Sequence, residues 1–142
     1  MKVKDVCHKV TEHADVVNRG ESVDQVIAGL ASNPATRAIY VTDDDQRLVG
    51  IISAKKLVNI LGARFVQSDT ISMPNEITAE TAEDLMFEPI SVTFDDTLTH
   101  ALEVMVHAQM QELPVIDKKG HVLADLNCFE LIADLQEQQK AA

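Results

Sequence analysis

The sequence predicts an α/β (α+β) fold made of two pseudo-symmetric β-α-β-β-α repeats that pack against each other through their sheets. Three observations predict it: an internal self-similarity, apolar residues at helical spacing, and short β-branched runs joined by turn residues. Residues 39–43 (Ile-Tyr-Val-Thr-Asp) align with residues 113–117 (Leu-Pro-Val-Ile-Asp) at an offset of 74, and the alignment runs without a gap to Gly50 and Ala124. Upstream the offset is 75, which one extra loop residue explains.

In the first repeat, a strand over 15–18 precedes a helix that opens with a capping box, in which Ser22 and Gln25 satisfy free amides reciprocally. Strands over 38–42 and 48–52 form a hairpin, because an Asp-rich turn separates them. A second helix follows. The apolar residues of both helices recur at i, i+3, i+4 and i+7, as in an amphipathic helix: Val23, Val26, Ile27 and Leu30, then Ala54, Leu57, Val58 and Leu61.

The second repeat predicts the same elements in the same order. A strand over 90–94 precedes a helix that either Asp96 or Thr97 caps. Strands over 113–116 and 121–126 flank the turn Asp117-Lys118-Lys119-Gly120, in which glycine accepts a positive φ. The apolar stripes of its helices are Leu98, Ala101, Leu102 and Met105, then Cys128, Leu131, Ile132 and Leu135.

These signals divide the chain into a first repeat over 1–66, a linker over 67–80 and a second repeat over 81–142. The stretch from Gly62 to Glu80 is typical of a linker that starts at a helix C-cap. A small sheet with two helices on one face leaves its other face apolar, so each repeat is expected to bury that face against its twin.

Composition narrows the function classes. A net charge of −11 disfavours nucleic acid and anionic membrane surfaces, although a local cluster of donors can still hold a small anion. No apolar stretch approaches the roughly 18 residues of a membrane helix, and the N-terminus lacks the apolar region of a secretory signal, so we expect a cytoplasmic protein. Met1 and the polar tail over 136–142 favour a free-standing protein.

The chain offers no motif for metal binding or catalysis. Cys7 and Cys128 have no metal-ligand spacing and are expected to be reduced structural thiols. His100 and His107 lie two helical turns apart, roughly 10 Å, which is too far to share one ion. No Gly-rich phosphate loop, HExxH or GxSxG sequence is present. We therefore expect a binding or regulatory module rather than an enzyme.

With its two repeats in this order, the sequence resembles a tandem pair of cystathionine-β-synthase (CBS) domains, the arrangement called a Bateman module. The resemblance covers residues 5–135 and is clearest in Asp84-Leu85-Met86, Ile90-Ser91-Val92 and Leu113-Pro114-Val115-Ile116-Asp117. It implies a sensor that needs no cofactor, binds AMP, ADP, ATP or S-adenosylmethionine as a regulatory ligand in the cleft between repeats, and forms a homodimer. Ligand contacts are implied at Ile90, Leu113, Pro114 and Tyr40, although Tyr40 also suits a packing role.

The family's ribose motif is Gly-hydrophobic-x-Thr/Ser-x-x-Asp, in which the carboxylate accepts both ribose hydroxyls. In the first repeat Gly50 and Ser53 match, but Lys56 replaces the acid and cannot accept from a diol. Lys56, with Lys55 and Ser53, could hold an anion at the helix N-terminus. An alternative without a ligand is that Lys55 and Lys56 lie on a solvated helix face and that Ser53 only caps the helix N-terminus.

In the second repeat Glu130 keeps the charge, while Ala124 and Asn127 depart from the motif. If an adenosine ligand binds, we expect it at Asn127 and Glu130. Asn127 also suits a plain N-cap, and Glu130 the helix dipole.

Two functions follow as hypotheses. The first is a nucleotide-sensing regulatory module with its ligand at the second-repeat site. The alternative is a CBS-fold dimer whose clefts no longer bind ligand and which bridges partner proteins; the departures at Lys56, Ala124 and Asn127 favour it.

Overall fold

The computed structural model describes residues 1–7, 15–32, 37–66 and 79–141. The described residues form two compact units, which we name after their last helices. The α2 unit contains residues 15–32, 37–45, 49–66 and 79–89. The α6 unit contains residues 1–7, 46–48 and 90–141.

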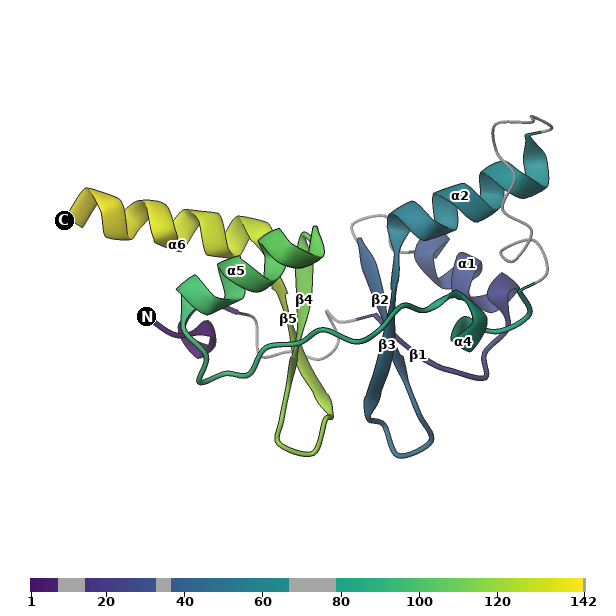
Figure 1. Cartoon of the computed structure of the whole chain (residues 1–142), viewed down its shortest axis with the longest axis horizontal. Coiled ribbons are helices and arrows are strands. Elements are labelled where there is room, and N and C mark those ends of the chain that lie inside the picture. The colour runs from purple at the N-terminus through teal and green to yellow at the C-terminus, as the bar shows by residue number, and fades with distance from the viewer. Residues whose placement is uncertain (8–14, 33–36, 67–78, 142) are drawn as a thin grey trace. The chain divides into compact units, whose positions relative to one another are not determined.

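The α2 unit has the predicted element order and a mixed α/β architecture (Figure 1). Its strands are β1 (Val16–Asn18), β2 (Ala38–Thr42) and β3 (Leu48–Ser53), in the sheet order β1-β2-β3. Helix α1 (Val23–Ser32) joins β1 to β2, which run parallel, as expected for a helical crossover. Helix α2 (Ala54–Phe65) follows β3, and the short helix α4 (Ala82–Leu85) comes after the linker. The linker prediction falls largely on residues 67–78, outside the described residues.

Local chemistry explains where these elements begin and turn. The capping box at the start of α1 is confirmed: the Gln25 amide donates to Ser22 Oγ at 3.2 Å, and the Ser22 amide donates to Gln25 Oε1 at 3.1 Å. In the hairpin turn, Asp43 Oδ1 accepts from the Asp45 amide at 2.9 Å. The last turn residue, Gln46, has a φ of 66°, at the position that Gly120 occupies in the second repeat.

The α6 unit contains a 3₁₀ turn η1 (Val3–Asp5), helix α5 (Leu98–Ala108), the antiparallel strands β4 (Glu112–Ile116) and β5 (Val122–Asn127), and helix α6 (Cys128–Ala141). Thr97, rather than Asp96, caps α5, because its Oγ1 accepts from the His100 amide at 3.1 Å. Gly120 adopts a φ of 90°, as its place in the turn predicts.

The strand predicted over 90–94 does not form; only Val92 pairs, in a parallel bridge to Val115. The sequence difference between Tyr40 and Pro114 explains this. In the α2 unit the Tyr40 amide donates to the Asp15 carbonyl at 2.8 Å and holds the start of β1. Pro114 stands at the equivalent position and has no N–H to donate, so the backbone at Ile90 is not tied to β4 in this way.

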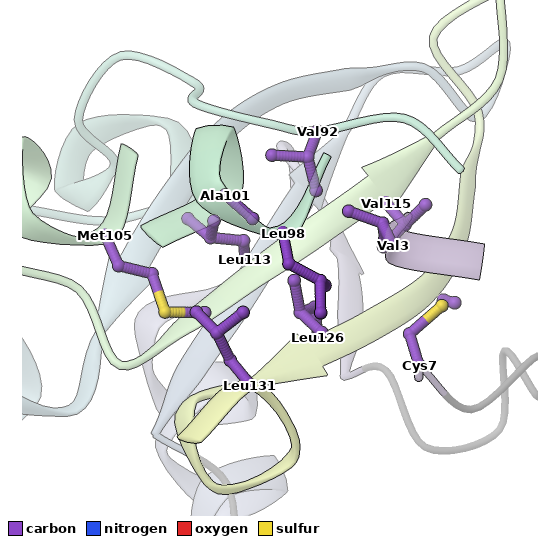
Figure 2. Packing of buried hydrophobic residues seen from close by; sticks show 11 residues of the cluster. Val3, Cys7, Val92, Leu98, Ala101, Met105, Leu113, Val115, Leu126 and Leu131 are labelled. Carbon is purple, nitrogen blue, oxygen red and sulfur yellow. The ribbon is translucent and has the colours of Figure 1, made fainter. Parts of the chain in front are cut away.

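The chain start packs into the core of the second repeat. The Val3 amide donates to the Asp96 carbonyl at 2.9 Å, and the Lys4 amide to the Phe94 carbonyl at 3.0 Å. Val3 and Cys7 are buried among the apolar residues of α5, β4, β5 and α6 (Figure 2). The repeat boundaries at 66 and 81 remain predictions, because these compact units follow contacts in space rather than the sequence repeat.

A similar segment opens the second repeat and packs in the α2 unit. The Ala82 amide donates to the Glu21 carbonyl at 2.8 Å, and Phe87 and Ile51 exchange two backbone hydrogen bonds of 2.9 and 3.2 Å. In both segments an aspartate accepts from backbone amides at the start of the turn, Asp5 from Lys2 and Asp84 from Glu80 and Thr81. The segment that opens each repeat therefore completes the unit that holds the other repeat's helices.

Each unit has its own apolar core. That of the α2 unit includes Val26, Ile39, Ile52 and Leu57, and that of the α6 unit includes Leu98, Leu113, Leu126 and Leu131. Two stripe residues at equivalent positions do not reach a core: Val58 is 64% exposed and Ile132 is 56% exposed. The predicted packing of one sheet against the other stays a prediction.

Candidate functional site

The candidate sites are the two equivalent junctions where a strand passes directly into a helix. The α2 junction is the β3–α2 boundary with Ser53 to Lys56, and the α6 junction is the β5–α6 boundary with Asn127 to Glu130. At each junction the first helical amide is anchored in the same way. The Ala54 amide donates to the Arg37 carbonyl at 2.9 Å, and the Cys128 amide to the Gln111 carbonyl at 2.8 Å. The two junctions thus have the same backbone anchoring and differ in their side chains.

At the α2 junction Ser53 is an N-cap. Its Oγ accepts from the Lys56 amide at 3.1 Å, which confirms the capping interpretation and leaves its hydroxyl proton available as a donor. The first turn of α2 carries no acidic residue, while Lys55 is exposed and Lys56 is half-buried. Two cationic side chains at a helix N-terminus favour an anion here.

The match at Gly50 has a packing explanation. Gly50 is buried in β3, and a Cβ placed on it would lie 2.7 Å from Met86 Cβ, with Met86 Cγ and Sδ also in conflict. Glycine is needed because the Met86 side chain lies directly on this backbone. The equivalent Ala124 belongs to the buried cluster that contains Cys7, a smaller residue from the corresponding N-terminal segment.

At the α6 junction Asn127 and Glu130 form a reciprocal capping box. The Glu130 amide donates to Asn127 Oδ1 at 2.9 Å, and the Asn127 amide donates to Glu130 Oε1 at 3.4 Å. Both residues are half-buried, and Glu130 Oε2 is shielded from solvent. The capping interpretation of Asn127 is confirmed, while a ligand role for either residue stays a prediction. The Asn127 Nδ2 group makes no hydrogen bond to the described residues.

Sequence reasoning overlooked Glu112, which lies beside this junction. Glu112 is directly opposite Asn127 in the β4–β5 register and is only 6% exposed. The signal was a charged residue next to the Leu113-Pro114 pair, at a position where the first repeat has Ala38. With Glu130, it brings a second carboxyl group to the end of the β4–β5 ladder.

The remaining predicted contacts are apolar or buried. Leu113 and Pro114 are buried in β4, and Tyr40 is fully buried in β2, which agrees with its expected packing role. Ile90 is half-buried and lines a groove of about 350 Å³ along α5, together with Val104, Ala108, His100, Glu103 and His107. The lining of this groove includes neither Asn127 nor Glu130, so the structure does not place Ile90 with the capping box. Across the described residues, no three His, Cys, Asp or Glu side chains are grouped to hold a metal.

Two carboxyl groups have a lowered pKa, and both are local structural acceptors. Hydrogen bonds from the Glu80 and Thr81 amides lower the pKa of Asp84. Hydrogen bonds from His121, first through its backbone amide, lower the pKa of Asp117 in the β4–β5 turn. The hydrogen bonds that lower these two pKa values stabilise the turns in which the carboxyl groups lie.

With this geometry established, comparison with known proteins gives the class. The CBS domain family model matches residues 3–63 and 82–124, more than half of the chain, and the chain belongs to the CBS domain family. A CBS domain-containing protein from Thermotoga maritima is 32% identical, with a TM-score of 0.82 over 96% of this chain and 95% of that one. The predicted tandem arrangement and mixed α/β fold are thereby confirmed.

Two further solved structures share the fold. CBSX2 from Arabidopsis thaliana, solved in complex with AMP, is 24% identical, with a TM-score of 0.74 and coverage of 96% of this chain and 98% of that one. The CBS domain pair of protein MJ0100, solved with 5′-methylthioadenosine and S-adenosyl-L-methionine, is 19% identical, with a TM-score of 0.73 and 98% coverage of both chains. A search of curated protein sequences found no match. Among the described helices, none is both long and apolar enough to cross a membrane.

Proposed function

We propose that this chain is a regulatory module that senses an adenosine-containing ligand, with its principal site at the α6 junction. The observation that carries the proposal is the Asn127–Glu130 pair, which keeps a carboxylate one helical turn from the end of β5 in a chain of the CBS family. Solved relatives of the same fold hold AMP, 5′-methylthioadenosine or S-adenosylmethionine. Adenosine is the part that these ligands share.

The α6 junction offers the groups that a ribose requires. The Glu130 carboxylate can accept hydrogen bonds from the two ribose hydroxyls once its side chain turns so that the shielded Oε2 is exposed, and Asn127 Nδ2 can donate to an oxygen of the sugar. Leu113 and Pro114 are buried in β4, and Ile90 lines a groove that does not include the capping box, so we assign none of the three a contact with ligand. At the α2 junction, Lys56 with Lys55 and Ser53 is assigned to an anionic group instead. We assign no contact with ligand to the buried Tyr40.

Regulation follows from differential binding. A ligand that binds one arrangement of the two repeats more tightly shifts the population toward that arrangement, by no more than the difference in its two affinities. The same principle applies to two subunits of a dimer. The module thus transmits ligand concentration to a partner without catalysing a reaction, as CBS pairs generally do, and requires no cofactor.

Isothermal titration with AMP, ADP, ATP and S-adenosylmethionine tests the proposal. We expect saturable binding of at least one of them and a loss of at least tenfold in affinity for Glu130→Ala, because a hydrogen bond to a charged group contributes about 1.5–3 kcal/mol. The matched control is Glu137→Ala, which removes an exposed acid from the same helix. If none of the four ligands gives a measurable heat of binding, the proposal is contradicted.

A second candidate is a ligand-independent dimerisation scaffold, favoured by apolar side chains exposed on the helices of the α6 unit. Helices α5 and α6 pack together (Figure 1). The large apolar residues exposed on these two helices are Leu102, Val106, Phe129 and Ile132, at 38%, 66%, 61% and 56% exposure. We propose this face as the homodimer contact in either function, and place the dimer in the cytoplasm.

Sedimentation without ligand, combined with the titration above, separates the candidates, because only the scaffold is a dimer that binds none of the four ligands. A scaffold stays dimeric when ligand is absent, dissociates in Val106→Glu or Ile132→Glu, and brings a partner protein with it on purification. A dimer that forms only with ligand, or a monomer under all conditions, would contradict the scaffold.

A further inference from the structure

Both units expose apolar side chains on their helices, and these side chains define two faces. The α6 face, proposed above as the dimer contact, consists of Leu102, Val106, Phe129 and Ile132. The α2 face is formed by exposed residues of α1 and α2, namely Ala31, Lys55, Val58 and Phe65. Val58 and Phe65 lie two turns apart on one side of α2, and they are 64% and 80% exposed.

The α2 face is continuous across its two helices. Asp24 of α1 and Arg64 of α2 form an ion pair of 3.2 Å, which joins the helices. Ala31 follows Asp24 by two turns and therefore lies on the same side of α1. Each unit thus presents a face built from two neighbouring helices, and each face leaves large apolar side chains in solvent.

The two faces differ in size and charge at equivalent positions of the repeats. Val106 of the α6 face corresponds to Ala31, and Phe129 corresponds to Lys55. Glu103 is exposed one turn before Val106, where the first repeat has an alanine. The α6 face is therefore bulky, with an acid at its edge, whereas the α2 face is smaller and carries a cation.

A contact between two identical faces makes poor use of these features. In a contact of like with like, residues near the twofold axis meet their own copies. Lys55 then approaches a second Lys55, and Glu103 a second Glu103, and like charges brought together at an interface are repelled. Side chains also interdigitate best where large residues meet small ones, which two α6 faces cannot provide.

A contact between the two different faces removes both problems. The Lys55 ammonium can lie over the Phe129 ring in a cation–π contact, with the Glu103 carboxylate as a nearby opposite charge. Val106 meets the small Ala31 instead of a second large residue. The same contact covers the exposed apolar side chains of both faces.

On this basis we propose that the α6 face of one copy packs on the α2 face of a second copy, so that the chains associate head to tail. This inference rests on the homodimer contact of the proposed function, since it specifies which surface of the partner copy that contact meets. Lys55, Phe129 and Glu103 determine the choice of face.

Cysteine cross-linking of the full chain with a short bis-maleimide tests the arrangement. Ala31→Cys and Val106→Cys each place one thiol on one face. We expect an equimolar mixture of the two variants to give at least about fivefold more covalent dimer than either variant alone. The wild-type chain, whose Cys7 is buried and whose Cys128 is half-buried, measures the background.

A charge exchange tests the residues that choose the face, with sedimentation equilibrium as the readout. Lys55→Glu places an acid near Glu103 and should weaken the dimer at least about fivefold. Glu103→Lys should act in the same direction, and the double variant Lys55→Glu with Glu103→Lys should recover the wild-type dissociation constant to within about twofold. The matched control is Lys119→Glu, which reverses an exposed lysine of the β4–β5 turn and should leave the dimer unaltered.

The outcomes separate this inference from the dimer itself. If each cysteine variant cross-links to itself as efficiently as the mixture does, the copies associate like with like, and the inference is wrong while the homodimer contact stands. Failure of the double charge variant to recover would also refute the choice of face. If the wild-type chain sediments as a monomer at every concentration, the homodimer contact and the inference are both wrong. Circular dichroism verifies that each variant is folded.

Discussion

Substitution of Gly50 by alanine tests the packing account of the one glycine that matches the ribose motif. A Cβ at this position would lie 2.7 Å from Met86 Cβ and 2.6 Å from Met86 Cγ, so the strand or the methionine must move. Overpacking a buried site costs about 1–3 kcal/mol. Because Met86 lies on a short segment and has a flexible side chain, we expect Gly50→Ala to lose about 2 kcal/mol of unfolding free energy.

Urea denaturation monitored by circular dichroism measures this loss as a shift in midpoint at constant slope. The matched control is Gly29→Ala in α1, where an added Cβ meets nothing within 4 Å. That variant should gain up to about 1 kcal/mol from helix propensity. The double variant Gly50→Ala with Met86→Cys copies the Ala124 and Cys7 combination of the other unit and should lose less than the sum of its single variants. Full stability of Gly50→Ala would refute the packing argument.

Three further predictions concern turns and caps. Gly120→Ala should destabilise the chain by about 1 kcal/mol in the same denaturation assay, because its φ of 90° strains an L-residue. Thr97→Ala should lose about 1 kcal/mol through the cap of α5, with Thr99→Ala on the exposed side of that helix as the control. Since the folded pKa of Asp117 is lowered from 3.8, its stabilisation is complete above that pH and is lost as the pH falls through the folded value. In Asp117→Asn, the unfolding free energy should therefore fall less steeply as the pH is lowered. If the fall is as steep as in the wild type, Asp117 does not contribute this stabilisation.

Sequence periodicity and turn chemistry predicted most elements because the signals are local. The capping box of Ser22 and Gln25, the hairpin turn at Asp43 and the positive φ of Gly120 all depend on residues within four positions of one another. The strand predicted over 90–94 was wrong because its pairing depends on an amide that Pro114, more than twenty residues away, lacks.

Long-range packing explains the other omissions. The segments around Val3 and Met86 each complete the unit that holds the other repeat's helices, and no local pattern shows this. A comparison of Asp5 with Asp84, both at the third position of a short turn, would have indicated that the two segments correspond. Similarly, Glu112 reaches the candidate site only through its register opposite Asn127.

The candidate site itself was predicted from residue types, but its geometry was not. Asn127 and Glu130 were each assigned two alternative roles, and the structure shows that they bond to each other in the capping role. Residue types alone could not predict this reciprocal capping box. The two lysines of the α2 junction, by contrast, were placed at the helix start from the sequence alone.

The most direct test of the account is an NMR titration of the ¹⁵N-labelled chain with 5′-methylthioadenosine. The account predicts saturable shifts of the backbone amide signals of Asn127, Cys128 and Glu130, absent in Glu130→Ala. A spectrum that does not change at these three amides at any ligand concentration, or that changes equally in the variant, would contradict it.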